Sequence, residues 1–477
     1  MTDPVVIVGG DAAGLSAASK LSRDDPDREV IVFERGRWVS YAHCGEPYFV
    51  KGEVEKLDDL LSLSPTEIDE RGINLQREHE VISVDTDART VTVKGPDGAF
   101  EQPYGDLVVA TGARARTAPI AGSELTGAFT IHGLDSAAAL RALLTPPAEF
   151  AVDDLGGGDS VDRAELARYG AMEPPETAAI VGGGYVGVEM AEALDAWDID
   201  VHLFQRSALP VPMFGEAVGE TVADHLREHD VDLHLGAEVE ELLGDDGHVA
   251  GVRCGDGSTL DADLAVVGVG VAPNVEIIEE TPVELGQSGA IAVDEYGETT
   301  VDGVYAAGDC AEDRHVVTGE PSWVPLGLTA NRAGRAIGQT LAGTPTETGG
   351  IAGTAVVKAF DEECGRAGIV DAEEARDAGF DPVSRTITAG SRSGYYPGNE
   401  KTMVTLVADR ETGRLIGGSI VGRDRAAVRI DTVATALEGG LTVEEVERLD
   451  LAYAPPFSPV WDPILVAAKV LNGALTG

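Results

Sequence analysis

Cysteine is scarce in this chain. Only four cysteines occur in 477 residues: Cys44, Cys254, Cys310 and Cys364. Their spacing contains no CxxC or CxxxxC pair, and such a low count excludes a disulfide framework. Any thiol chemistry must therefore rest on a single sulfur, which can attack a substrate disulfide but cannot close a local one.

Basic residues are also in short supply. The sequence has 35 Lys and Arg against 83 Asp and Glu, a net charge of -48. This balance argues against nucleic acid and anionic membranes as partners, because both would be repelled. The carboxylates are spread along folded-looking segments, as expected for a protein of a high-salt cytoplasm, where ions screen the charge. An anionic substrate would then need a local basic patch.

Long apolar runs are missing as well. No apolar stretch reaches the roughly 18 residues of a membrane helix. The chain runs from Met1 into a strand-like segment without the basic and apolar regions of a secretory signal. We therefore expect a soluble cytoplasmic protein. A hydrophobic content of 43% is enough to build the cores of about three domains.

The N-terminus has the pattern of a βαβ unit. An apolar run at 4–8 leads into a glycine-rich loop and a helical pattern, and a second apolar run at 30–33 ends at Glu34. Backbone N–H groups at such a helix start can hold a pyrophosphate, and a carboxylate at the strand end can bind ribose hydroxyls. Asp11 replaces the usual middle glycine. The loop residues are Gly9, Gly10, Ala12, Ala13 and Gly14.

The same pattern recurs after the apolar run at 178–181. Here all three glycine positions are occupied, by Gly182, Gly184 and Gly187, with Tyr185 inside the loop. The corresponding strand end carries Gln205 and Arg206 instead of an acid. A neutral residue followed by arginine favours a ribose with a 2′-phosphate, so we expect NADPH in preference to NADH.

Two further motifs follow strand-like runs. One consists of Ala110, Thr111 and Gly112, and the other of Gly308 and Asp309. The four motifs, in this order, resemble the pyridine nucleotide–disulfide oxidoreductases over nearly the whole chain. The resemblance implies an α/β fold with two Rossmann-like dinucleotide-binding domains, for FAD and NAD(P)H, and a C-terminal α+β dimerisation domain. It also implies that Asp309 contacts the flavin cofactor and that Tyr185 lies over the flavin.

The domain boundaries follow from this resemblance. We expect a discontinuous FAD-binding domain at 1–120 and 273–340, an NAD(P)H-binding domain at 121–272, and a dimerisation domain at 345–477. The segment at about 145–175 is rich in Pro, Gly and Asp, and we expect an acidic, mobile surface loop there.

The stretch 44–48 (CGEPY) distinguishes between branches of the family. It is similar to the single-cysteine branch of coenzyme A disulfide reductases and NADH oxidases and peroxidases. The oxidases and peroxidases carry a histidine at the position of Ala12, so the alanine favours the reductases. By this resemblance Cys44 is the redox cysteine of a homodimer, and Tyr395 and Tyr453 of the partner subunit protonate the departing thiolate.

The surroundings of Cys44 predict its reactivity. Pro47 suits a first helical turn, so Cys44 should lie at a helix start, where the helix dipole favours the thiolate. His43 could assist if charged. Glu46 would oppose ionisation, so we expect it to point outward, or else to mark a different substrate.

Substrate contacts follow from the same resemblance, because coenzyme A carries phosphates. The residues implied are Ser16, Lys20, Arg23, Ser40, His43 and the partner subunit's Trp461. No metal site is predicted. Coenzyme A disulfide and coenzyme A persulfide or polysulfide both stay open as substrates, although the end of the chain at Gly477 favours the plain disulfide. An oxidase or peroxidase that uses a cysteine sulfenic acid and a flavin-based redox sensor are the alternative functions.

Overall fold

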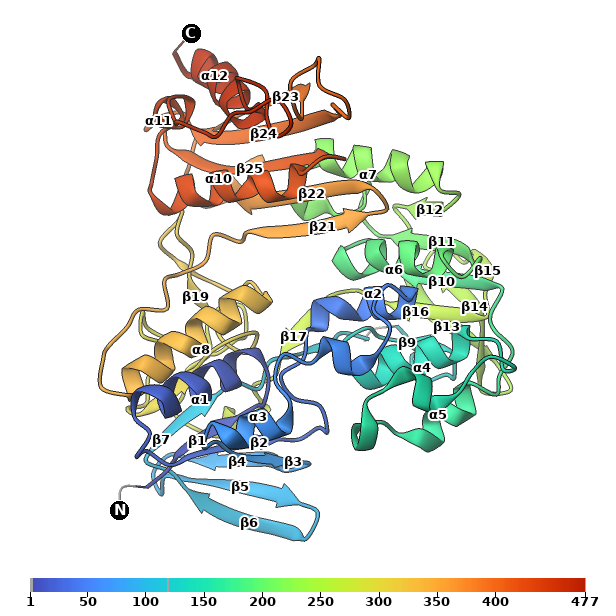
Figure 1. Ribbon diagram of the computed structural model, residues 1–477, viewed down its shortest axis with the longest axis vertical. Helices are drawn as coiled ribbons and strands as arrows, with labels where there is room; N and C mark the ends of the chain where they lie inside the picture. The colour runs from blue at the N-terminus through green and yellow to red at the C-terminus, as the bar shows by residue number, and fades with distance from the viewer. Residues whose placement is uncertain (1–2, 118–119, 477) are drawn as a thin grey trace.

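The computed structural model describes residues 3–117 and 120–476. The first glycine-rich loop belongs to a five-stranded parallel sheet with the order β18-β7-β1-β2-β3 (Figure 1). Its strands are β1 (Val5–Val8), β2 (Val30–Glu34), β3 (Asn74–Arg77), β7 (Asp106–Val109) and β18 (Val304–Ala306). Because β18 lies almost 200 residues after β7, two separate stretches of chain build this sheet.

Alternate residues of β1 face opposite layers, so the strand is apolar throughout. Val5 and Ile7 pack against two helices, whereas Val6 and Val8 pack against a three-stranded antiparallel sheet. A strand buried on both faces needs a continuous apolar run, which is what the sequence has. The covering elements are α1 (Ala12–Asp24), α8 (Gly327–Leu341), β4 (Glu80–Asp85), β5 (Thr90–Gly95) and β6 (Gly98–Pro103).

The second glycine-rich loop belongs to a sheet with the order β12-β11-β10-β16-β9. Helices cover one face, where Ile180 is buried, and a three-stranded antiparallel sheet covers the other, where Val181 is buried. The sheet strands are β9 (Ala128–Phe129), β10 (Thr177–Val181), β11 (Asp200–Gln205), β12 (Asp232–Leu235) and β16 (Leu264–Val267). The covering elements are α4 (Leu134–Leu144), α6 (Tyr185–Asp195), α7 (Glu216–Glu228), β13 (Val239–Asp245), β14 (His248–Cys254) and β15 (Thr259–Asp261).

Short elements connect these domains. An antiparallel pair of strands, β8 (Ala113–Ala115) and β17 (Val271–Pro273), forms where the chain passes between the two large sheets. The remaining short elements are α2 (Glu46–Lys51), α3 (Pro65–Glu70), β19 (Asp313–Arg314) and β20 (Pro321–Ser322). Among residues 3–117 and 120–476, no helix is both long and apolar enough to cross a bilayer.

The segment 145–175 is not the irregular surface loop that its composition predicts. It contains α5 (Arg163–Tyr169), and Leu155, Val161 and Leu166 join the same buried cluster as Trp38. A few well-spaced apolar residues anchor the segment, and burying each of them contributes about 1.5–3 kcal/mol. The expectation of a solvated loop was therefore wrong.

The C-terminal domain is an antiparallel sheet with the order β21-β22-β25-β24-β23 and four helices. The structure confirms the predicted architecture of two parallel sheets behind glycine-rich loops and a C-terminal α+β domain. The strands are β21 (Ala355–Ala359), β22 (Glu362–Gly368), β23 (Pro382–Gly390), β24 (Lys401–Asp409) and β25 (Leu415–Gly422). The helices are α9 (Ala372–Asp377), α10 (Ala426–Glu438), α11 (Val443–Glu447) and α12 (Pro463–Thr476).

Candidate active site

The carboxylate of Glu34 is fixed at the end of β2 beside the first loop. Its Oε2 accepts a hydrogen bond from the Gly10 N–H (2.8 Å), and its Oε1 accepts one from the Gly36 N–H (2.7 Å). In open parallel sheets, nucleotides bind outside the carboxyl ends of the strands, which is where this carboxylate lies.

The first loop depends on close contacts that only glycine allows. Gly9 has a φ of +114°, and a Cβ there would overlap the Ala110 carbonyl oxygen. A Cβ on Gly14 would overlap the Gly9 carbonyl oxygen. With these contacts α1 begins directly at the sheet edge, and Ala12 and Ala13 form its first turn. The backbone N–H groups of that turn are placed to bind phosphate.

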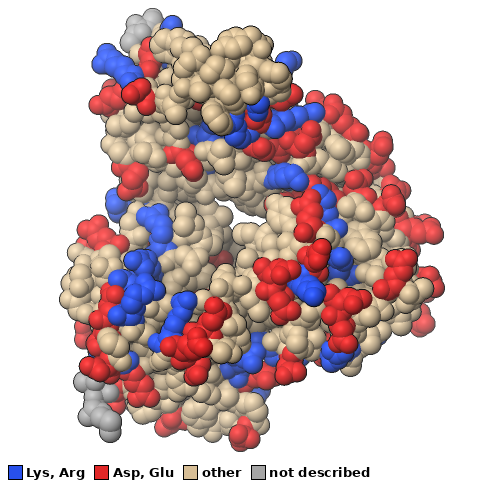
Figure 2. Space-filling model, viewed as in Figure 1, with Lys and Arg blue, Asp and Glu red and all other residues tan. Residues whose placement is uncertain are grey.

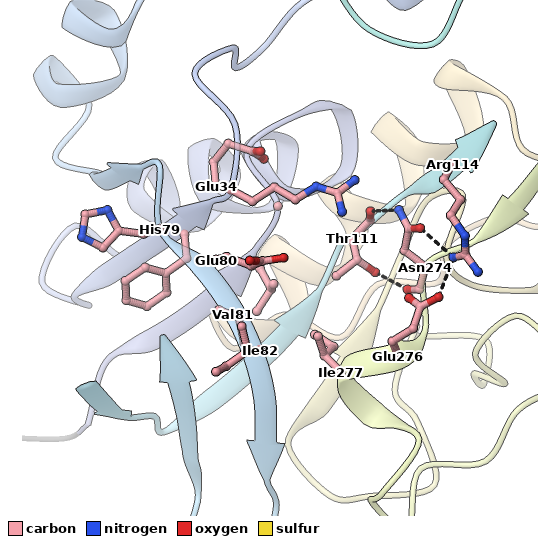
Figure 3. A pocket seen from close by; sticks show the side chains of 14 residues that line it. Glu34, His79, Glu80, Val81, Ile82, Thr111, Arg114, Asn274, Glu276 and Ile277 are labelled. Carbon is pink, nitrogen blue, oxygen red and sulfur yellow. Dashed lines mark hydrogen bonds and ion pairs between the residues drawn. The ribbon is translucent and has the colours of Figure 1, made fainter. Parts of the chain in front are cut away.

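A cavity of about 380 Å³ adjoins Glu34 (Figure 3). Thr111 Oγ1 donates to the Asn274 carbonyl oxygen (2.6 Å), and Asn274 Nδ2 donates to the Thr111 carbonyl oxygen (2.9 Å). Gly112 also accepts a hydrogen bond from the Asn274 N–H (3.0 Å). These bonds make one wall of the cavity rigid. The volume lies in the range of small-molecule pockets.

The late motif follows β18. Gly308 has a φ of +81°, and burial raises the pKa of the Asp309 carboxyl. Cys310 is fully buried, with its Sγ 3.4 Å from the carbonyl oxygens of Val109 and Ala307, so it packs in the core as expected. Cys254 and Cys364 are also buried.

The second loop repeats the glycine contacts of the first. A Cβ on Gly182 would overlap the Gly268 carbonyl oxygen, and a Cβ on Gly187 would overlap the Gly182 carbonyl oxygen. Gln205 Oε1 accepts a hydrogen bond from the Gly183 N–H (3.0 Å), much as Glu34 does for Gly10. A neutral amide therefore occupies the strand end here, and Gly184 caps α6.

Arg206 and Tyr185 lie at the mouth of this second unit. The Arg206 side chain is 81% exposed, and its Nη1 lies 3.7 Å from Glu238 Oε1. An ion pair this exposed contributes little stabilising free energy, so the guanidinium is available to a ligand. Tyr185 is the first residue of α6 and packs edge-on against Phe214.

Cys44 is exposed and lies in a 3₁₀ turn, His43–Gly45, directly before α2. The predicted helix start is therefore present, with Pro47 in its first turn. However, the surrounding protein partly desolvates the exposed sulfur, which raises the pKa of Cys44, and the carboxylates of Glu189, Glu46 and Asp309 raise it further. The expected preference for the thiolate was wrong in direction, because desolvation comes first among the causes and the carboxylates of three segments add to it.

Glu46 is buried, and the expectation that it points outward was also wrong. Its side chain is 1% exposed, and its Oε2 accepts a hydrogen bond from the Gly133 N–H (3.1 Å). Its Oε1 lies 3.5 Å from His43 Nδ1. His43 Nε2 in turn lies 2.5 Å from Asp11 Oδ2. Burial lowers the pKa of His43, but the hydrogen bonds to Asp11 and Glu46 prevail and raise it to about 10.

Asp11 thus has a role that sequence reasoning missed. Its Oδ1 accepts a hydrogen bond from the Tyr41 N–H (3.1 Å), and its Oδ2 pairs with His43. The residue that departs from the glycine pattern therefore ties the first loop to the segment before Cys44. The aspartate in place of the usual middle glycine was the signal in the sequence that could have revealed this role.

Two acids on α6 reach toward α2, and neither was predicted. Tyr48 Oη donates to Glu189 Oε1 (2.9 Å), and burial raises the pKa of Glu189 to about 7 although this hydrogen bond lowers it. One turn later, Glu192 Oε1 lies 2.7 Å from both Lys51 Nζ and Lys358 Nζ. The helix that starts at the second loop is therefore bound to the helix that follows Cys44.

Comparisons with known proteins identify the family. Residues 3–334 match the pyridine nucleotide-disulphide oxidoreductases, and residues 354–463 match the dimerisation domain of the same group. The chain belongs to this family. Proteins of this pyridine nucleotide–disulfide oxidoreductase family use FAD and NAD(P)H, and the chain is an NAD(P)H-dependent flavoprotein oxidoreductase.

Several relatives in the family share the full length of the chain. A Pyrococcus horikoshii protein named NAD(P)H coenzyme A polysulfide/persulfide reductase is 38% identical over 474 residues, which is 99% of each chain. A Staphylococcus aureus coenzyme A disulfide reductase is 29% identical over 458 residues, 95% of this chain and 96% of its own. The solved structure of an NAD-dependent persulfide reductase from A. fulgidus has a TM-score of 0.90 and 33% identity. That match covers 99% of this chain and 84% of the other.

The first unit fits the FAD of this family. Glu34 supplies a fixed carboxylate for ribose, the glycine loop leaves room for a pyrophosphate, and the cavity beside Thr111 accepts a group of adenosine size. Asp309 lies close enough to Cys44 to influence its ionisation, so the late motif and the thiol share one site.

The predicted tyrosines lie in the C-terminal domain. Tyr395 is 76% exposed and Tyr453 is 48% exposed, and a hydrogen bond with Tyr395 raises the pKa of Tyr453. Trp461 is exposed too, at 53%, as are Phe457 and Val460. So many large exposed apolar groups in one domain are typical of a surface that binds a partner.

Apart from Trp461, the predicted substrate residues are divided between α1 and the Cys44 segment. Ser16 Oγ donates to Asn331 Oδ1 (2.7 Å), Lys20 Nζ pairs with Asp24 (2.5 Å), and Arg23 is exposed. Ser40 has a φ of +53°, and its N–H donates to the Gly10 carbonyl oxygen (3.0 Å).

Basic groups gather where α1 lies beside α8. Figure 2 shows Lys and Arg over these helices, on a molecule otherwise rich in acid. Arg71 belongs there, because its Nη1 donates to Ser19 Oγ (3.2 Å), and Arg335 on α8 is exposed. Sequence reasoning missed both, since they lie far from α1 along the chain.

Proposed function

We propose that this protein is an FAD-dependent NAD(P)H:disulfide reductase that acts on coenzyme A disulfide, or on coenzyme A persulfide or polysulfide, through Cys44. The observation that carries the proposal is the position of the thiol. It is exposed, it has no second cysteine nearby in sequence, and the carboxylates of both Asp309 of the first unit and Glu189 of the second influence its ionisation.

The chemistry balances with one thiol. The Cys44 thiolate attacks one sulfur of the substrate, so the substrate S–S bond breaks, a mixed disulfide forms and a coenzyme A thiolate leaves with a proton. When bound, FAD supplies the route by which two electrons of NAD(P)H reach that mixed disulfide. Reductive cleavage then frees the second coenzyme A and returns Cys44 as a thiolate, so its raised pKa does not stop the next attack.

Tyr395 and Tyr453 are proposed as the proton donors, acting on Cys44 of the partner subunit in a homodimer. Their exposure, their mutual hydrogen bond and the family's dimerisation domain support this role. A tyrosine with a raised pKa is protonated at neutral pH and can give its proton to a leaving thiolate. The partner subunit's Trp461 is proposed to contact the substrate from the same surface.

The phosphates of coenzyme A are proposed to bind over α1 and α8. Lys20, Arg23, Arg71 and Arg335 supply the positive charge that an anionic substrate needs on so acidic a protein. Ser16, Ser40 and His43 are proposed to line the path from these cations to Cys44.

The division into domains and the nucleotide contacts belong to the same proposal. We propose that the FAD-binding domain spans 1–120 and 273–340, the NAD(P)H-binding domain 121–272 and the dimerisation domain 345–477. We also propose that each glycine loop contacts its own nucleotide and that NADPH is preferred to NADH. We also propose a cytoplasmic enzyme of a salt-rich cell, because a net charge of -48 needs screening by ions.

A steady-state assay in molar KCl tests the proposal. NADPH and NADH are each tried against coenzyme A disulfide, polysulfide with coenzyme A, other thiol disulfides and oxygen. Cys44→Ser should abolish disulfide and persulfide reduction but retain FAD, whereas Cys254→Ala, at a buried cysteine of β14, should remain active. Full activity of Cys44→Ser would refute the proposal. Fast oxygen consumption without thiol substrate would favour the oxidase alternative, and no turnover with any acceptor would favour the sensor.

A further inference from the structure

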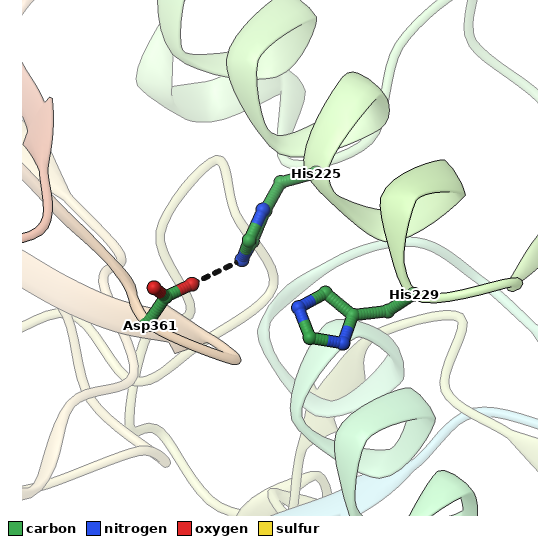
Figure 4. Close-up of side chains that lie close together, drawn as sticks. All are labelled: His225, His229 and Asp361. Atoms are coloured by element: carbon green, nitrogen blue, oxygen red, sulfur yellow. Dashed lines mark ion pairs between the residues drawn. The ribbon is translucent and has the colours of Figure 1, made fainter.

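Three side chains converge outside the active site (Figure 4). His225 lies in the last turn of α7, His229 follows that helix by one residue, and Asp361 lies in the two-residue turn between β21 and β22. One ligand atom from each of the three lies within 4.8 Å of the other two. Two imidazoles and a carboxylate therefore meet from two different domains.

His225 is the most buried of the three side chains. It is only 3% exposed, and its Nδ1 lies 3.1 Å from Glu228 Oε2. Its Nε2 lies 2.5 Å from Asp361 Oδ1, yet that nitrogen has no hydrogen-bond partner of acceptable geometry among the described residues. Arg423 Nη2 can only donate and lies 3.1 Å from His225 Nδ1, so without an ion the ring proton is on Nε2 and faces Asp361. A divalent metal ion can bind the same two atoms in place of that proton.

The outer contacts resemble those around a bound metal ion. Histidine ligands usually donate their second ring N–H to a carboxylate, and Glu228 Oε2 is placed to accept from His225 Nδ1 once a metal ion takes the place of the Nε2 proton. Arg423 lies on the outer side, with its Nη2 3.1 Å from His225 Nδ1 and its Nη1 3.5 Å from Asp361 Oδ2. Asp361 Oδ1 is left to face His225.

The three ligand residues line a hollow of about 450 Å³. Other residues that line this hollow hold the ligand residues in place. The His229 ring stacks on Phe360, with centroids 3.8 Å apart and planes 7° apart. The Phe360 N–H donates to Glu192 Oε2 (2.9 Å), so the turn that carries Asp361 is fixed. The ligand atoms are therefore held close together before an ion arrives.

We propose that His225, His229 and Asp361 bind a divalent transition-metal ion of the Zn²⁺ class, with water as the fourth ligand. Two histidines and one carboxylate are a ligand set that zinc accepts with one position left to solvent. The ion would join α7 of the second unit to the β21–β22 turn of the C-terminal domain. A His-x₃-His spacing across the end of α7 is the signal in the sequence, because it brings two imidazoles to the same side.

Zinc uptake by the FAD-loaded protein tests this site. The Cys44→Ser background removes an exposed thiol that would bind Zn²⁺ itself. After EDTA treatment, the protein is dialysed against Zn²⁺ in molar KCl, and bound zinc is measured by mass spectrometry. We expect one equivalent per chain that His229→Gln and Asp361→Asn each remove. Glu228→Gln should weaken the affinity for Zn²⁺ by about 10- to 100-fold.

A second histidine–aspartate cluster provides the matched control. Asp200, His202 and Asp232 also lie within 4.8 Å of one another, on β11 and β12, and His202→Gln should leave the equivalent in place. Added Zn²⁺ should raise the Tm of the Cys44→Ser protein but not that of its His229→Gln derivative. No uptake would mean that a proton occupies the gap between His225 and Asp361. That result, or uptake that survives His229→Gln, would overturn the proposal.

Discussion

The loop after β1 and the loop after β10 both bring a helix against the carboxyl edge of a parallel sheet. In each loop a glycine of the helix touches the first glycine of the loop, Gly14 on Gly9 and Gly187 on Gly182. These contacts are nearly identical, because both loops must leave backbone N–H groups free for a pyrophosphate. The common part of the two units is therefore the part that handles phosphate.

The units differ in how they connect to Cys44. In the first, Asp11 takes the middle position of the loop and binds Tyr41 and His43, so the loop itself holds the Cys44 segment. In the second, Gly184 takes that position and leaves open space. The connection is made instead by α6, through Glu189. One unit thus controls the thiol through its loop and the other through its helix.

Breaking the shared contact should have the largest effect. Gly14→Ala and Gly187→Ala each push a Cβ into a loop carbonyl oxygen, and overpacking of this kind costs about 1–3 kcal/mol. We expect Gly14→Ala to weaken FAD retention and Gly187→Ala to weaken NADPH binding, each by about 10- to 100-fold. Flavin content per chain and single-turnover flavin reduction separate the two effects.

Gly184→Ala is the control for this pair, because nothing lies within 4 Å of a Cβ built there. It should change flavin content very little. If Gly187→Ala lost FAD as readily as Gly14→Ala does, the two loops would not serve different nucleotides.

The sequence predicts the common part of the two units well. Apolar runs of four or five residues before glycines are local patterns, and Glu34 and Gln205 lie where those patterns place them. The residues that distinguish the units are harder to predict. The burial of Glu46 depends on the N–H of Gly133, which is 87 residues away, so its neighbours in sequence give no indication of it.

Composition is also a poor guide to the segment 145–175. Pro and Gly are frequent there, which is typical of loops, yet Leu155 and Val161 are buried against distant partners such as Trp38. Cys44 shows the same limit. Its place before a helix was predicted, but the direction of its pKa shift was not, because Glu189 comes from another domain.

Glu189→Gln tests whether the helix of the second unit controls the thiol. The carboxylate is the largest charge that raises the pKa of Cys44, so its removal should speed alkylation by iodoacetamide about three- to tenfold at pH 8.5. Because the pKa of Glu189 is about 7, wild type carries little charge there at pH 6, and the ratio of the two rates should fall toward one.

Glu192→Gln, one turn later on α6, is the matched control and should alkylate like wild type. A rate ratio for Glu189→Gln that stays constant between pH 6 and 8.5 would show that ionisation of Glu189 does not govern the thiol.

Arg206→Ala tests the strand end of the second unit. The exposed guanidinium should pair with a 2′-phosphate, and its loss should raise the KM for NADPH about three- to tenfold while leaving that for NADH unchanged. Glu238→Gln removes its present partner and should lower the KM for NADPH slightly. Equal effects on both nucleotides would mean that Arg206 does not recognise the phosphate.

Asp11→Asn tests the loop connection of the first unit, with the smallest expected effect. The folded pKa of His43 is about 10, above its ordinary 6.5, so the pair stabilises the fold fully below pH 6.5 and is lost as pH rises toward 10. The ring is 41% exposed, so water screens the pair, and we expect a loss of about 1 kcal/mol. The Tm of Asp11→Asn should fall by about 1 °C at pH 6, because a chain of 477 residues has a large entropy of unfolding. Near pH 10 the difference should shrink, and only the weakening of the hydrogen bond from the Tyr41 N–H, which an amide oxygen still accepts, should remain. A Tm difference that is the same at both pH values would show that Asp11 acts through Tyr41 alone and leaves His43 uncharged.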